Sequence, residues 1–212
     1  MKIALIGASG YVGSALLKEA LSRGHHVTAL VSRPERIEAQ ANLAAAKVDV
    51  QDSAQLAEQL KGFDAVVSAF SGHAQAEQFD YYVKGVRSII AAAKAAQAPR
   101  LLVVGGAGSL EVAPGVQLVD TPEFPEQWKA SALGAREALN LLRAETELNW
   151  TLLSPSAMLQ PGQRTGQFRL GKDQLLVDAE GNSHISVEDY AVAMIDELEK
   201  GEHQRSRFTV GY

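Results

Sequence analysis

Short apolar runs alternate with longer amphipathic stretches along most of the chain. The apolar runs predict strands at Lys2–Ile6, His25–Val31, Ala46–Val50, Ala65–Ser68, Arg100–Val104 and Asn149–Leu153. The stretches between them predict helices at Tyr11–Ser22, Ser53–Leu60, Gln75–Gln97 and Pro125–Thr146. Continuously apolar strands are typical of a parallel sheet that is buried on both faces. The alternation therefore predicts an α/β fold with a doubly wound parallel sheet and right-handed crossovers.

The last third of the chain departs from this alternation. Two strand-like pieces, Gln167–Leu170 and Gln174–Val177, flank a turn at Gly171–Asp173. An amphipathic helix at Val187–Lys200 and a short strand at Arg207–Val210 follow. This region is too small to form a second domain. We therefore expect one domain over residues 1–212, in which residues 155–185 cap the substrate side of the sheet.

A glycine-rich turn directly follows the first predicted strand. Gly7, Gly10 and Gly13 separate that strand from the first predicted helix. In Rossmann folds such a turn holds the pyrophosphate of a dinucleotide against the helix N-terminus. We assign pyrophosphate binding to the residues Gly7, Ala8, Ser9, Gly10, Tyr11 and Val12. A strand-to-helix turn that binds no ligand is the alternative.

The end of the second predicted strand bears on which nicotinamide cofactor is used. An NAD enzyme usually places an acidic residue there, whereas this chain has Ser32, Arg33 and, further on, Arg36. A guanidinium group pairs well with a 2′-phosphate, so the sequence predicts that NADP(H) is preferred and that NAD(H) is also accepted. Solvated loop charges are the alternative interpretation of these arginines.

Residues after the other strands predict the rest of the ligand crevice. Asp49 and Val50 are expected to frame adenine, although Asp49 could equally cap the turn that follows. The expected path to the nicotinamide consists of Ser68, Ala69, Phe70, Ser154 and Pro155. The expected acceptor pocket consists of Gly106, Ser109, Trp128, Ser156 and Met158.

Composition and charge narrow the classes of function. The chain has 212 residues, a net charge of −5 and no cysteine, which excludes disulfides and thiolate chemistry. It has no basic stripe, so we expect no nucleic-acid partner. The apolar run before Gly7 is too short for a signal peptide and no run could span a membrane, which predicts a cytoplasmic protein. The scattered histidines predict no metal site, and a homodimer is left open.

Several motifs occur together along the chain: GASGYVG, VSRPERI, VDVQD, RLLVVGGAG, NWTLLSPS and ISVEDYA. Together they resemble the atypical short-chain dehydrogenase/reductase family, and within it the bacterial NADH-flavin reductase subgroup related to biliverdin/flavin reductase. In the alignment, Lys129 and Leu133 occupy the positions of the superfamily's catalytic tyrosine and lysine, and Ala157 replaces a histidine of mammalian flavin reductase. Tyr81 and Tyr82 stand on a different helix. The resemblance therefore implies cofactor binding without the usual Tyr-Lys dyad.

These observations predict an NAD(P)H-dependent oxidoreductase that passes a hydride to a small-molecule acceptor. Free flavin (FMN or FAD, as substrate rather than prosthetic group) or a quinone fits best, because solvent can supply the proton and the protein need only hold two flat rings together. A redox sensor that binds NADP(H) without turnover is the main alternative. An epimerase or dehydratase that uses Lys129 or Lys172 is a third.

Overall fold

One eight-stranded sheet forms the centre of the computed structural model, which describes all of residues 1–212. Its strand order is β10-β12-β8-β5-β4-β1-β2-β3. The parallel strands are β1 (Lys2–Ile6), β2 (His26–Val31), β3 (Leu43–Lys47), β4 (Ala65–Ser68), β5 (Leu101–Val104), β8 (Trp150–Ser154) and β12 (Ser206–Gly211). Only β10 (Arg169–Gly171) joins antiparallel, along β12.

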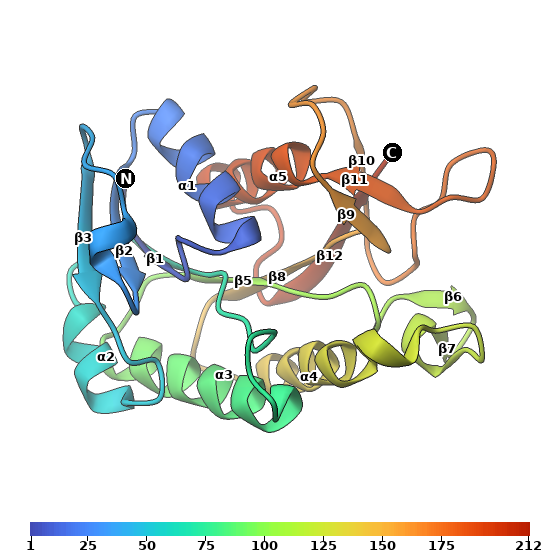
Figure 1. The fold of residues 1–212 in the computed structure, drawn as a ribbon, viewed down its shortest axis with the longest axis horizontal. Coiled ribbons are helices and arrows are strands. Elements are labelled where there is room, and N and C mark those ends of the chain that lie inside the picture. Colours follow the sequence, from blue (N-terminus) through green and yellow to red (C-terminus); the bar gives the residue numbers. More distant parts are fainter.

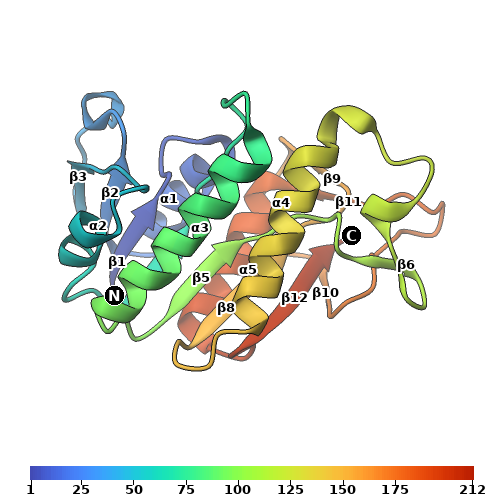
Figure 2. The same ribbon diagram turned by 90° about the horizontal axis from the view of Figure 1, so that it is seen from below.

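Helices cover both faces of this sheet (Figure 1). On one face lie α1 (Tyr11–Ser22) and α5 (Val187–Lys200). On the other lie α2 (Ser53–Gln59), α3 (Gln78–Ala95) and α4 (Glu126–Arg143), with α3 and α4 running side by side in Figure 2. This arrangement confirms the predicted doubly wound α/β fold. None of the helices combines the length and apolar character needed to cross a membrane.

Two apolar cores, one on each face, hold the layers together. Side chains along a strand point alternately to opposite faces. In β1, Ile3 and Leu5 therefore join the core under α1 and α5, whereas Ala4 and Ile6 join the core under α2, α3 and α4. Burial on both faces is the reason that β1 has a continuous apolar run.

The prediction for the third strand was wrong. The structure places β3 at Leu43–Lys47 instead of Ala46–Val50, paired in register with β2 from Val27 to Val31. It is the edge strand of the sheet, and its side chains are largely exposed. Its sequence, LAAAK, has no β-branched residue, and alanine favours helices more than strands. Val48 and Val50 are buried in the core beyond the strand end, which made their segment resemble a strand.

Short pieces in the last third of the chain also differ from expectation. Gln174–Val177 forms no strand, and Gln174 makes only an isolated bridge to Glu111. Two small ribbons were not predicted: β6 (Glu111–Ala113) with β7 (Val116–Gln117), and β9 (Met158–Gln160) with β11 (His184–Ser186). Strands of two or three residues are too short for a clear pattern in the sequence, and β9–β11 also depends on pairing between distant segments.

The carboxylate of Asp189 fixes the loop that precedes β10. Asp189 is fully buried on α5 and accepts hydrogen bonds from the main-chain N–H groups of Thr165 and Gly166, both at 2.8 Å. The Tyr212 hydroxyl donates to it at 2.7 Å. Burial opposes ionisation, but these bonds outweigh it and lower the pKa of Asp189. The C-terminus and the loop are thereby fastened to α5.

Close backbone contact explains two glycines of the turn after β1. Gly7 has φ +77°, and a Cβ there would lie 2.6 Å from the carbonyl oxygen of Ala69. A Cβ on Gly13 would lie 2.0 Å from the carbonyl oxygen of Gly7. Gly10 differs, because its φ of −78° suits any residue and its Cβ would lie 3.3 Å from that oxygen. Gly7 and Gly13 are thus required by packing alone.

We expect Gly13→Ala to lower the free energy of unfolding by about 2 kcal/mol or more, because α1 must move away from β1 to relieve a main-chain clash. Gly10→Ala, in the same turn, should cost about 1 kcal/mol or less, the usual price of alanine at an N-cap. Urea unfolding of the three proteins measures both values. Equal losses in the two variants would contradict this account of the turn.

Candidate functional site

A cavity of about 780 Å³ opens at the carboxyl ends of β1, β4, β5 and β8. This edge of an open parallel sheet is where α/β proteins bind ligands, and the volume suits an organic molecule. Ten of the predicted site residues line it: Gly10, Tyr11, Val12, Ala69, Phe70, Gly106, Trp128, Pro155, Ser156 and Met158. The structure thus brings together residues from five separate segments of the chain.

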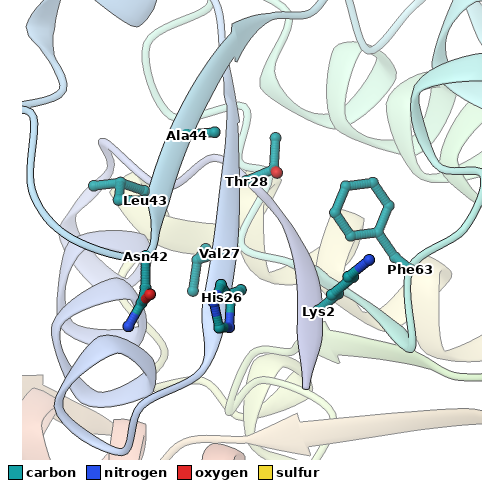
Figure 3. Close-up of a pocket in the computed structure, with 8 residues that line it drawn as sticks. All are labelled: Lys2, His26, Val27, Thr28, Asn42, Leu43, Ala44 and Phe63. Atoms are coloured by element: carbon teal, nitrogen blue, oxygen red, sulfur yellow. The ribbon is translucent and has the colours of Figure 1, made fainter.

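A second hollow lies at the opposite end of the strands. It has about 430 Å³ and is lined by the first residues of β1, β2 and β3 together with Phe63. Figure 3 shows Lys2 and Phe63 on one side of it and Asn42 and Leu43 on the other. Since it is at the amino ends of the strands, it is separate from the crevice at the glycine turn.

The N-terminus of α1 faces the first cavity and is open to an anion. Gly10 is the N-cap and supplies no side-chain hydrogen bond, and the first turn has no acidic residue. The main-chain N–H groups of Tyr11, Val12 and Gly13 donate to no protein acceptor, since the first helical bond runs from Ser14 to Gly10. Orphan N–H groups and the helix dipole together favour a phosphate.

The other residues of the turn have different surroundings. Ala8 is buried in the core, whereas Ser9 is exposed beside Gly10. The Tyr11 side chain is also exposed, and its hydroxyl lies 3.5 Å from the carbonyl oxygen of Leu159. Partial burial, together with the Glu188 carboxylate, raises the pKa of Tyr11. Its hydroxyl therefore stays neutral next to the anion site.

The loop after β2 is outside the cavity and fully accessible. Ser32, Arg33 and Arg36 are exposed, and neither guanidinium group forms an ion pair with a carboxylate. Arg33 precedes a short 3-10 helix at Pro34–Arg36. Both arginines can therefore pair with a charged ligand without first breaking a bond to the protein.

Asp49 and Val50 follow β3 and are mainly engaged with the protein. Asp49 Oδ1 accepts a hydrogen bond from the Gln51 N–H at 2.9 Å, so this carboxylate caps the turn. Val50 is part of the core. The structure thus supports the capping role that the sequence left open for Asp49, whose side chain is otherwise exposed.

Phe70 and Tyr82 form a stacked pair in the cavity wall. Their ring centroids are 5.9 Å apart and their planes differ by 6°. Ala69 lies beside them, while Ser68 is buried at the end of β4. Sequence reasoning missed Tyr82. One signal was available in the sequence, a glycine inside the predicted helix at Gly85. The structure gives the reason for it: a Cβ there would lie 2.2 Å from the Phe70 ring.

The structure places two predicted hydroxyls away from the cavity. Arg207, whose side chain is 2% exposed, donates to Ser109 Oγ at 3.2 Å and to Ser154 Oγ at 3.3 Å. Its Nε also donates to Asp173 at 2.9 Å. Burial lowers the pKa of Arg207, and the Asp173 carboxylate opposes that shift. These serines therefore satisfy a buried guanidinium group behind the cavity wall.

The end of the cavity around Trp128 is aromatic, and Glu123 is the one carboxylate in the cavity lining. Phe124, Trp128 and Met158 lie there with the main chain of Gly105–Gly108, and the Trp128 ring meets His73 edge-on at 6.4 Å. The α4 residues that face the cavity are Trp128, Ser131, Ala132 and Ala135. No group of three His, Asp or Glu side chains comes together as a metal site.

Comparison with known proteins agrees with this geometry. A family model described as NAD(P)H-binding matches residues 7–199. The chain belongs to this NAD(P)H-binding family. The match spans the glycine turn, both helical layers and α5, so the resemblance to atypical short-chain dehydrogenases/reductases is confirmed.

Individual relatives of this NAD(P)H-binding protein cover its whole length. YwnB of Bacillus subtilis, which is uncharacterised, is 46% identical over 99% of this chain and 98% of its own. A structure from Bacteroides thetaiotaomicron, provisionally named an epimerase, is 51% identical with a TM-score of 0.94 and covers 100% of this chain and 96% of its own. A Streptococcus pneumoniae structure, provisionally named an NADH-flavin reductase, is 38% identical with a TM-score of 0.86, over 100% and 99% of the two chains. The family and the reductase relative support an oxidoreductase.

We expect Asp173→Ala to lower the free energy of unfolding by about 1 to 3 kcal/mol, because Arg207 is then a buried cation without a carboxylate. Arg143→Ala is the matched control. Arg143 also pairs with Asp173, at 3.1 Å, but its side chain is 49% exposed. Its loss should therefore cost about 0.5 kcal/mol or less. Thermal unfolding checks both, and equal effects would contradict the role given to Arg207.

Proposed function

We propose that this protein is an NAD(P)H-dependent oxidoreductase that transfers a hydride to free flavin or a quinone-like acceptor. The observation that supports this best is the continuity of the cavity. It runs from the open N-terminus of α1 at Gly10 to the aromatic compartment around Phe70 and Trp128. One cavity can therefore hold a dinucleotide by its phosphates and a second flat molecule beside its nicotinamide.

The residues present fit such a cofactor. The unpaired N–H groups of Tyr11, Val12 and Gly13 can hold the pyrophosphate, and Ala69 and Pro155 line the path to the nicotinamide. NAD(P)H, when bound, supplies the hydride. The protein's own contribution is to orient two rings at about 3–3.5 Å and to exclude water from between them. An aromatic wall with a glycine-rich floor suits that task.

The exposed loop after β2 supports a preference for NADP(H) with use of NAD(H) as well. Arg33 and Arg36 have no competing carboxylate partner, and guanidinium groups bind phosphate through charge-assisted hydrogen bonds. NADP(H) differs from NAD(H) only in the 2′-phosphate on the adenosine ribose, which these guanidinium groups can bind. The two cofactors would therefore differ in affinity at this loop alone.

The other functions considered have less support. A sensor without turnover has no need for space beside the nicotinamide, and the extension of this cavity to Phe124 and Trp128 favours a second ligand. An epimerase is suggested by the provisional name of one relative, but Lys129 and Lys172 are absent from the cavity lining and Lys129 pairs with Glu126 at 3.6 Å. The cavity-facing side of α4 offers no tyrosine and no lysine as an acid or base.

We expect purified protein to oxidise NADPH in a saturable manner when FMN, FAD or a naphthoquinone is added, and not without an acceptor. Absorbance at about 340 nm measures this directly. The two cofactors differ only in the contact between Arg33 and the 2′-phosphate. NADH should therefore support the same reaction with a similar kcat and a higher KM. Tight cofactor binding without oxidation by any acceptor would overturn the proposal in favour of the sensor.

We expect Arg33→Ala to weaken NADPH binding about 10-fold, the loss of one hydrogen bond to a charged group, and to leave NADH binding nearly unchanged. Arg87→Ala is the control, since it removes the same charge from the exposed surface of α3. Titration calorimetry of the wild type and both variants with each cofactor gives the six affinities. If both cofactors weaken equally, Arg33 does not bind the 2′-phosphate.

A further inference from the structure

Tyr82 places an unpartnered hydroxyl group in the acceptor end of the cavity. The residue is 7% exposed and lines the cavity from the second turn of α3. Its hydroxyl forms no hydrogen bond with the protein. The oxygen nevertheless keeps some accessible surface. What little of Tyr82 is accessible therefore faces the cavity.

The other buried or half-buried hydroxyl groups of the lining already have partners. Thr121, Ser131 and Ser156 each donate to a main-chain carbonyl, at 2.8, 2.9 and 2.8 Å. Buried hydroxyl groups are normally hydrogen-bonded, and an exception indicates a missing partner. In a ligand-sized cavity, the natural partner is an acceptor atom of the ligand.

The Tyr82 side chain packs closely against two glycines, which leave room for it. A Cβ on Gly134 of α4 would lie 3.1 Å from the Cδ1 atom of Tyr82, and one on Gly72 would lie 3.2 Å from its Cβ. Phe70 stacks on the ring, and Gly85 leaves room for Phe70. Glycine inside a helix lowers the stability of that helix. Gly85 in α3 and Gly134 in α4 therefore make room for the two stacked rings at a cost in helix stability.

Tyr82 lines the cavity together with the carboxyl end of β5. Val104, Gly105 and Gly106 belong to the same lining. Tyr82 therefore shares the cavity with the edge of the sheet where the nicotinamide is expected.

We propose that the Tyr82 hydroxyl donates a hydrogen bond to a carbonyl oxygen of the acceptor. The protein would thereby select flat acceptors in which a carbonyl is conjugated with the ring that takes the hydride. This inference rests on the proposed function and names the atom that recognises its substrate. Tyr82 belongs to α3, whereas the positions of the superfamily's Tyr-Lys dyad belong to α4, the helix after β5.

The electron balance explains why this contact matters. The acceptor gains a hydride from the nicotinamide, which is oxidised, and the added electron pair leaves a negative charge on the conjugated carbonyl oxygen. The hydrogen bond from the Tyr82 hydroxyl to that oxygen becomes stronger as the negative charge develops. Burial raises the pKa of Tyr82 to about 12, so the group remains a donor at neutral pH and solvent supplies the final proton.

The test compares Tyr82→Phe with Tyr81→Phe, its neighbour outside the cavity lining. Equilibrium dialysis measures the binding of 1,4-naphthoquinone and of naphthalene, which lacks the carbonyls, with NADP⁺ present so that no turnover occurs. We expect Tyr82→Phe to weaken naphthoquinone about 3- to 10-fold and to leave naphthalene unchanged. Tyr81→Phe should change neither. Thermal unfolding should be unchanged in both variants, because the Tyr82 hydroxyl has no protein partner to lose.

Turnover gives a second readout. With naphthoquinone and NADPH, Tyr82→Phe should lower kcat about 10- to 100-fold, because the bond is strongest in the transition state, while the KM for NADPH stays constant. Equal effects on naphthoquinone and naphthalene, no effect on either, or no binding of naphthoquinone to the wild type would each overturn the inference. If the wild type oxidises no NADPH with any acceptor, the proposed function fails, and the dialysis result still decides whether Tyr82 recognises a carbonyl.

Discussion

The contact between the first turn of α1 and the main chain at the end of β1 determines the architecture of the ligand edge. Gly13 lies against the Gly7 carbonyl and Gly7 lies against Ala69, at separations that leave no room for a Cβ. This contact brings the N-terminus of α1 next to the end of β4. The unpaired N–H groups of α1 consequently face the same cavity as the aromatic residues of the β4–α3 segment.

Behind the cavity, buried charges stabilise the walls without entering them. Arg207 connects β12 to the segments after β5 and β8 through Ser109 and Ser154, and Asp173 neutralises it. Asp189 similarly ties the loop before β10 to α5 and the C-terminus. Because these charges are satisfied within the protein, neither Arg207 nor Asp189 belongs to the cavity lining, in which Glu123 is the one carboxylate.

Sequence reasoning was most accurate where a local pattern has a single structural meaning. The glycine turn, the central strands β1, β2, β4, β5 and β8, and the long helices were predicted within a few residues. It failed at β3, because this alanine-rich edge strand has no β-branched residue. It also missed β6–β7, whose strands have only two or three residues, and β9–β11, which pairs distant segments. Ser154 ends β8 and Ser109 lies in the segment after β5, as expected, but their hydroxyl groups turn toward Arg207.

The sequence by itself determined the fold class and the NAD(P)H-binding family, because alternating apolar runs and the glycine spacing depend on contacts between near neighbours in the chain. Only the tertiary structure decided which side chains face the cavity. Tyr82, in an amphipathic helix, and Arg207, in a strand, are both buried polar residues. The Tyr82 hydroxyl has no protein partner, whereas the Arg207 guanidinium group bonds to Asp173 and Ser109. Partners from distant segments make that difference, and no local pattern records them.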